Sequence, residues 1–285
     1  MFVNKISLKK IKMCSWNGYI EWLLSPKFFI FLAAIFFFYD YATVPLLEVA
    51  EKTNSKLNFL EIFIAIGNSG MILLIMPVLF IVLISDFPKN DNSTLFFVIR
   101  TGKYNWLISQ YLQLIYMVVT YIAVLFIGTV IPIIGRSSIS SEWSKIIIKY
   151  IADSPEKRNS FVYELLPENL SNQHSLVEAF IYTLVFETAF LIVIGMINIV
   201  FNTFSKSLGG TYFSCALVIV GTVLCAIGSK SMWIFPTANA TLKVHYTQFL
   251  REPVFSIAHS YLYFITIIVC LLLISIRFTK KCNYS

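Results

Sequence analysis

The 285-residue chain is 58% hydrophobic and 13% charged, with a formal net charge of +7, and its mean hydropathy is +0.76. A soluble domain of this length has no interior large enough for so much apolar surface, so the composition excludes one and predicts an all-α polytopic membrane protein. The positive charge is assigned to basic residues that flank membrane spans rather than to nucleic-acid binding.

Residues 1–27 combine five lysines with interleaved aromatic and aliphatic residues. The stretch is too polar to be the apolar core of a cleaved signal peptide, and no small-residue cleavage site follows it. We therefore expect a basic amphipathic helix at the inner membrane interface, with Trp16 and Trp22 at headgroup depth.

Six apolar runs follow, and each is close to the ~20 residues that cross a bilayer as a helix. They cover residues 28–47, 62–84, 107–135, 176–204, 208–228 and 255–276. The sequence thus predicts one transmembrane domain over residues 1–285, with six transmembrane helices and no separate soluble domain.

The distribution of charge predicts the orientation of these spans. With the N-terminus inside, the inner segments hold 12 basic and three acidic residues, whereas basic and acidic residues nearly balance in the outer segments. Inner segments of membrane proteins carry the excess of Lys and Arg, so we expect both termini to be cytoplasmic.

The polar segment 86–106 between the second and third runs predicts a short cytoplasmic helix. One of three residues caps its N-terminus, namely Asp91, Asn92 or Ser93, and Gly102 ends it. Leu95, Phe96 and Ile99 share one face of this helix. Two turns of helix are not stable alone in water, so we expect this face to contact a partner protein or the membrane surface.

Two further segments outside the runs have no clear spanning pattern. In the large extracellular loop 136–175, Trp143, Ile147 and Ile151 fall on one helical face, which predicts a helix lying on the outer leaflet or a lid that senses substrate. The stretch 229–254 is too short and too polar to cross the membrane, so we expect a re-entrant or surface segment.

The sequence lacks the motifs of common catalytic and nucleotide sites. It contains no GxxxxGK[ST], no HExxH and no GxSxG. The five cysteines form no CxxC pair and the three histidines are scattered, so we expect neither a metal nor a disulfide. We therefore expect no catalytic residues and no cofactor in this chain, and a membrane-embedded enzyme is disfavoured.

Polar residues inside predicted spans are costly and mark candidate functional positions. Glu187 lies near the middle of the fourth run, and Thr183, Asn198 and Asn202 fall on the same third of that helix. His259 belongs to a weaker polar stripe in the sixth run. The candidate translocation-path residues are Glu187, Asn198, Asn202 and His259; the alternative for the stripe is a structural hydrogen bond between helices.

The stretch SDFPKNDNSTLFFVIRTGKYNWLISQYL, residues 85–112, together with the six-span topology and the basic N-terminal helix, resembles the type-2 ATP-binding-cassette (ABC) exporter permeases of bacteria. In that family an acidic residue ends the second span, a small-polar-then-leucine helix follows, and a basic or small-residue turn opens the third span. These positions correspond here to Asp86, Ser93-Thr94-Leu95 and Arg100-Thr101-Gly102-Lys103. The long outer loop is larger than in minimal members.

The resemblance implies that segment 86–106 is a coupling helix that docks on a separate ATPase subunit, which binds ATP and Mg. The implied docking residues are Asp86, Leu95, Phe96, Ile99, Arg100 and Lys103. It also implies a second permease copy, identical or different, in a bacterial plasma membrane, and export of an amphipathic or hydrophobic solute such as an antimicrobial or signalling peptide. The competing hypothesis is an ATPase-independent immunity protein or passive channel.

Overall fold

The computed structural model describes residues 6–70, 72–89, 92–138, 140–153, 156, 160–166, 168–205, 208–247 and 253–281. Within them, five helices are long and apolar enough to cross a membrane, or six if one bent pair of helices counts as a single span. The prediction of a helical polytopic membrane protein is confirmed. Whether the spans number five or six depends on the bent pair.

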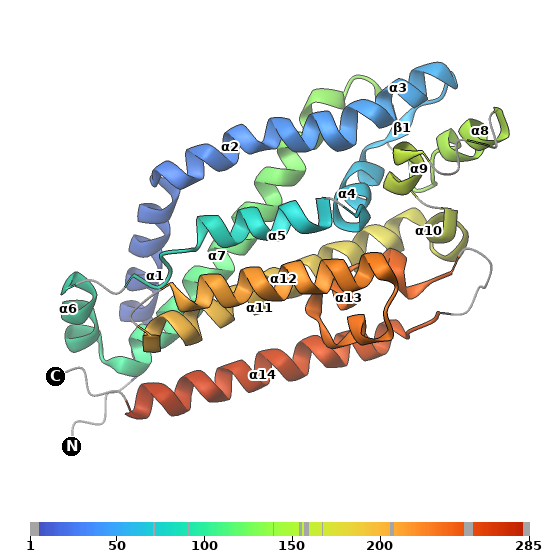
Figure 1. Ribbon diagram of the computed structural model, residues 1–285. Helices are drawn as coiled ribbons and strands as arrows, with labels where there is room; N and C mark the ends of the chain where they lie inside the picture. Colours follow the sequence, from blue (N-terminus) through green and yellow to red (C-terminus); the bar gives the residue numbers. More distant parts are fainter. Residues whose placement is uncertain are drawn as a thin grey trace.

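The long helices run between the same two ends of the molecule (Figure 1). They are α2 with its continuation through η1 and α3 (Pro26–Phe38, Tyr39–Thr43 and Val44–Lys52), α7 (Lys103–Val130), α11 (Leu176–Ser205), α12 (Gly209–Ile227) and α14 (Ile257–Lys281). Their limits lie within a few residues of five of the six apolar runs. Short η2 (Ile131–Ile133) continues α7.

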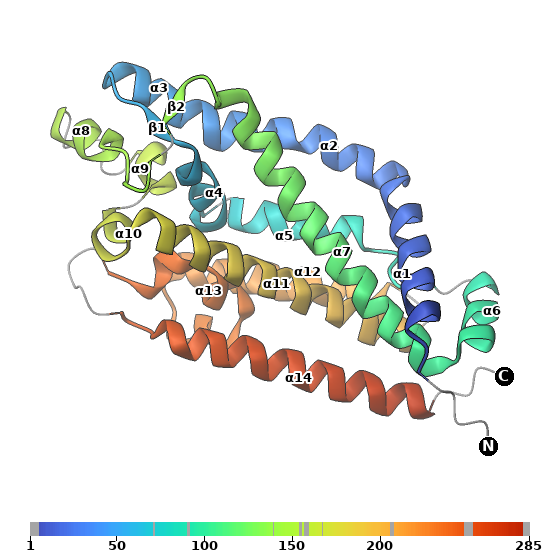
Figure 2. The same cartoon turned by 180° about the vertical axis from the view of Figure 1, so that it is seen from behind.

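At one end lie α1 (Leu8–Leu23), α6 (Asn92–Thr101) and the last turn of α14 (Figures 1 and 2). We call this the α6 end. At the opposite end lie α3, β1 (Leu57–Asn58), β2 (Ser137–Ser138), α8 (Ile146–Asp153), α9 (Phe161–Leu165) and α10 (Glu168–Gln173). The first and last helices of the chain thus reach the same end as α6, whereas the side of the membrane that this end faces stays a prediction.

The second apolar run does not form one straight helix. It divides into α4 (Phe59–Asn68) and α5 (Ile72–Leu83), which are bent by 83° relative to each other. The Asn68 side chain donates to the carbonyl of Ile64, 2.9 Å away, and Ser69 takes an extended backbone (φ −87°, ψ 137°). Local hydrogen bonding by the Asn68 side chain favours this interruption over a continuous helix.

Helix α1 lies against α7 rather than apart from the bundle. The Tyr19 hydroxyl and Thr120 Oγ1 are 2.6 Å apart. Trp16 is half exposed, as expected for an interfacial residue, but Trp22 is buried and its ring N–H donates to the carbonyl of Leu83. Trp22 therefore belongs to the protein interior, contrary to the expectation that it lies among lipid headgroups.

The segment 229–247 folds back between the long helices. It forms η4 (Lys230–Ile234), α13 (Pro236–Ala240) and η5 (Leu242–His245), and α13 contacts α11, α12 and α14. Every residue of α13 is buried. Burial of α13 agrees with a re-entrant segment, whereas η4 before it exposes Lys230, Ser231 and Ile234, so the alternative of a surface segment stays open for that part.

The described parts of the loop 136–175 are packed onto the bundle. Strands β1 and β2 pair in parallel, and both the backbone N–H and the hydroxyl of Ser144 donate to the Glu61 carboxylate, which also helps to cap α4. The predicted helix begins only at Ile146, so Trp143 precedes it. The Trp143 ring N–H donates to the carbonyl of His174 at 2.8 Å, which fixes the start of this loop to the beginning of α11.

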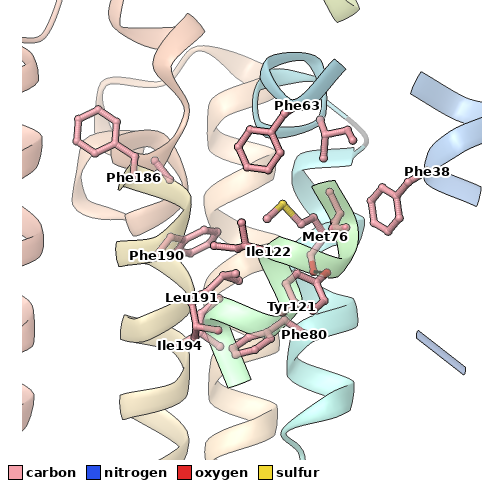
Figure 3. Packing of buried hydrophobic residues seen from close by; sticks show 14 of the residues in the cluster. Phe38, Phe63, Met76, Phe80, Tyr121, Ile122, Phe186, Phe190, Leu191 and Ile194 are labelled. Atoms are coloured by element: carbon pink, nitrogen blue, oxygen red, sulfur yellow. Dashed lines mark hydrogen bonds between the residues drawn. The ribbon is translucent and has the colours of Figure 1, made fainter. Parts of the chain in front are cut away.

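Several of the largest buried side chains meet between α5, α7 and α11 (Figure 3). Phe80 from α5 and Tyr121 from α7 lie 5.1 Å apart between ring centres, and the Tyr121 hydroxyl donates to the carbonyl of Met76. Phe190 and Ile194 of α11 complete this cluster. The arrangement makes α7 the helix that connects the α6 end to the buried faces of α5 and α11.

Candidate functional site

Helix α6 is present where the sequence predicts a short cytoplasmic helix. It spans Asn92–Thr101, and Gly102 follows it with a φ of +90°, a conformation that favours glycine. The predicted cap Asp91 lies outside the described residues, as do the side chains of Asn92 to Leu95, so neither the cap nor the position of the Leu95 side chain is described.

Two of the predicted docking residues are strongly exposed on α6. Phe96 is 69% and Ile99 is 70% exposed, and Arg100 beside them is also exposed, whereas Val98 is buried at 2%. Lys103 is half-buried at the start of α7. The Lys10 ammonium donates to the carbonyl of Arg100 at 3.1 Å, which attaches the end of α6 to α1. The helix is therefore held by one face and presents an apolar face outward.

Asp86, the remaining docking candidate, lies in the loop before α6 and forms an ion pair with Lys27 at the start of α2. A second ion pair joins Lys89 of the same loop to Glu21 of α1, at 2.9 Å. The charges of this loop thus bind it to the α1–α2 elbow. Because both pairs are more than half exposed on the carboxylate side, each adds little to stability alone.

The polar stripe on α11 is buried throughout. Thr183, Glu187, Asn198 and Asn202 are each at most 4% exposed, so the stripe faces other helices, as expected. The members are not one site, however. Glu187 and Asn202 are fifteen residues apart in one α-helix, which corresponds to about 22 Å at the ordinary rise per residue.

Glu187 lies where α11 approaches α4 most closely. A Cβ atom on Gly67 of α4 would fall 2.4 Å from the Thr183 methyl and 3.5 Å from Glu187 Oε1, so only glycine allows this approach. Thr183 accepts a hydrogen bond from Asn68, whose side-chain oxygen accepts from the backbone N–H of Lys243. Among the described residues, Glu187 Oε1 has no hydrogen-bond partner. A buried carboxyl oxygen without a partner leaves a hydrogen bond unmade, and a translocated or bound group would supply that hydrogen bond.

Asn202, by contrast, is held by structural hydrogen bonds, whereas Asn198 Nδ2 has no hydrogen-bond partner among the described residues. The Asn202 side chain donates to the carbonyl of Phe87 at 2.9 Å and accepts from the backbone N–H of Gly210. Thr211 Oγ1 lies 3.5 Å from Asn198 Oδ1. These contacts bind the α11–α12 hairpin to the end of α5 and its loop, so the alternative of an interhelical hydrogen bond describes Asn202 better than a path.

His259 lies apart from this stripe, on the exposed face of α14. Its neighbour Ser260 is the buried residue, and Ser260 Oγ donates to Asn239 Oδ1 and lies 2.8 Å from His245 Nε2. This Asn239–His245–Ser260 cluster, which the sequence did not single out, holds the re-entrant segment against α14. Burial lowers the pKa of His245 to about 4, so the ring is neutral at pH 7.

No group of three or more His, Cys, Asp or Glu side chains that would hold a metal ion occurs in the part of the chain that the structure describes. No protein-family model, curated protein or solved structure matches this chain. The functional argument therefore depends on α6 with its exposed apolar face, on the buried carboxyl of Glu187, and on the helices that join them.

Proposed function

We propose that this chain is the permease subunit of an ABC exporter, in which α6 docks on a separate ATPase subunit. The observation that carries the proposal is the exposed pair Phe96 and Ile99 on a helix whose opposite face is fixed to the bundle. Amphipathic helices that present apolar anchors in this way bind in grooves of partner proteins.

The proposal assigns the remaining parts of the chain as follows. The ATPase supplies ATP and Mg chemistry, and a second permease copy completes the pathway in a bacterial plasma membrane. Both termini and α6 face the cytoplasm. Glu187 belongs to the translocation path of an amphipathic or hydrophobic solute, for which an exported peptide is the preferred class, because a buried carboxyl without a partner suits a cationic group.

Nucleotide binding drives a permease only through a contact that differs between its two states. At the α6 end, α6 is the described segment between spans that exposes an apolar face large enough for such a contact. The competing class is a self-contained membrane protein, in which α6 would rest on the membrane surface.

The test is co-purification of the full chain with ATPase subunits from its own cell, followed by measurement of ATP hydrolysis in reconstituted vesicles. We expect one ATPase to co-purify and its hydrolysis rate to change when the permease is present. Reporter fusions at Lys89 and Ser140 check the orientation and should read cytoplasmic and external, respectively. If the chain purifies without any ATPase and lipid covers the exposed face of α6, the result would support the self-contained class instead.

A further inference from the structure

A cavity of about 140 Å³ lies at the α6 end, between α1 and α7. One wall is a single face of α1, from Cys14 to Trp22, continued by Ser25 and Lys27, and the facing wall is Trp106, Gln110, Gln113 and Met117 of α7. Phe97 of α6 also lines the cavity. The loop before α6 closes the third side. The volume is close to that of the ~150 Å³ engineered cavity that holds a benzene molecule, so the space takes a group of about that size.

Two amide side chains form the interior of this cavity. Gln110 is 7% and Gln113 is 6% exposed, and neither side chain has a hydrogen-bond partner among the described residues. Both amides border the cavity, where water or a ligand supplies the hydrogen bonds that the protein does not. Each amide offers two N–H donors and one oxygen acceptor. A ligand that supplies both oxygen atoms and N–H groups would therefore form the hydrogen bonds that the two amides do not make within the protein.

The rim of the cavity carries balanced charge. Among the described residues, its ionic groups are the two pairs Lys27–Asp86 and Glu21–Lys89, and their formal charges sum to zero. If the cavity bound an anion alone or a cation alone, the rim and the ligand together would carry one unpaired charge. A zwitterion places its phosphate at the lysines and its ammonium at the carboxylates, so all six charges remain paired.

The position of the cavity indicates where such a ligand comes from. The α1 wall belongs to a helix that exposes Lys9, Lys10 and Lys12 and half-exposes Trp16. Exposed lysines with an exposed tryptophan are typical of helices at the level of lipid headgroups. The mouth of the cavity therefore lies at the depth where phospholipid headgroups lie.

We propose that this cavity binds the phosphoethanolamine headgroup of a membrane phospholipid, with the Gln110 and Gln113 amides as its interior hydrogen-bonding groups. The acyl chains remain outside, along the exposed apolar surface of α2 and α7. The assignment does not depend on docking through Phe96 and Ile99, because neither side chain lines the cavity, whereas Phe97 of α6 and Asp86 of the preceding loop do.

The test uses the full chain in nanodiscs of phosphatidylcholine with equal shares of phosphatidylethanolamine and phosphatidylglycerol, followed by mild detergent extraction and quantification of retained lipid by native mass spectrometry. We expect wild type to retain phosphatidylethanolamine about tenfold over phosphatidylglycerol, because the neutral rim leaves the net negative charge of the phosphatidylglycerol headgroup without a partner. The double variant Gln110→Leu/Gln113→Leu should retain about tenfold less phosphatidylethanolamine than wild type, the factor that two ordinary hydrogen bonds provide, whereas Gln173→Leu at the opposite end should retain as much as wild type.

Two further measurements separate the alternatives. The double variant should melt at or above the wild-type temperature, because it removes amides that have no protein partner; a large loss of stability would show that the amides are structural and would overturn the proposal. Glu21→Gln leaves the rim positive and should shift retention toward phosphatidylglycerol. Equal retention of both lipids by wild type, or displacement of the lipid by soluble glycerophosphoethanolamine at equal concentration, would refute a lipid headgroup as the occupant.

Discussion

Removal of the exposed apolar side chains of α6 gives the sharpest test of the docking proposal. Full burial of a side chain such as Phe or Ile is worth about 1.5–3 kcal/mol. Because Phe96 and Ile99 are 69% and 70% exposed, about two thirds of that value remains to be gained on docking. Phe96→Ala and Ile99→Ala are therefore each expected to lose about 1–2 kcal/mol of docking energy, which is about five- to thirtyfold in affinity.

The same exposure predicts that these variants fold normally. Truncation of an exposed side chain changes the free energy of unfolding by less than about 0.5 kcal/mol. Val98→Ala is the matched control on the other face of α6, because Val98 is 2% exposed. It should destabilise the permease by about 1.5–3 kcal/mol while the outward face of α6 is unchanged.

The assay titrates the co-purifying ATPase against the detergent-solubilised permease variants and records their melting temperatures and coupled ATP hydrolysis in parallel. The docking proposal requires weaker binding and uncoupled hydrolysis with unchanged melting for Phe96→Ala and Ile99→Ala. Unchanged affinity and coupling in both variants would refute the reasoning and would place α6 on the membrane surface.

Three other predictions concern buried polar groups. Glu187→Ala should impair transport while the ATPase still co-purifies, because Glu187 lies within the bundle; loss of assembly would instead make it a structural residue. Asn202→Leu leaves the carbonyl of Phe87 and the N–H of Gly210 without a partner, and should lower the free energy of unfolding by about 2–4 kcal/mol; unchanged denaturation would contradict this. The pKa of His245 is lowered from 6.5 to about 4 by burial, so the unfolded chain binds more protons between these pH values. Stability is therefore fully present above pH 6.5 and should fall by up to about 3 kcal/mol toward pH 4, and His245→Gln should flatten that part of the stability profile.

Length and hydropathy were sufficient to predict five of the long helices, because a helix that crosses a bilayer must satisfy its own backbone within an apolar run. Length and hydropathy did not predict the break between α4 and α5, because hydropathy averaged over a whole run conceals a short polar interruption. The signal was present as Gly67-Asn68-Ser69-Gly70, a cluster typical of a turn. In an apolar surrounding, Asn68 has neighbouring backbone and Thr183 as partners, and the helix can end there.

Side-chain direction in the last span was harder to predict. The polar stripe of α14 contains both His259 and Ser260, and periodicity alone does not decide which one faces the interior. The structure buries Ser260 because the re-entrant segment brings Asn239 and His245 to it. That segment lies at least fifteen residues away in the sequence, so only the tertiary fold determines its partners.

The arrangement of α7 explains how a contact at α6 acts on the buried side chains of α5 and α11 in the proposed permease. Helix α6 is joined to α7 through a single residue, Gly102, and the Asn105 side chain donates back to the carbonyl of Thr101 at 2.7 Å. Farther along α7, Tyr121 packs among the buried side chains of α5 and α11 (Figure 3). Packed interiors deform little, so a displacement of α6 must move α7 as a unit or be absorbed at Gly102. A Gly102→Ala variant, strained at its positive φ, should therefore alter coupling more than ATPase affinity.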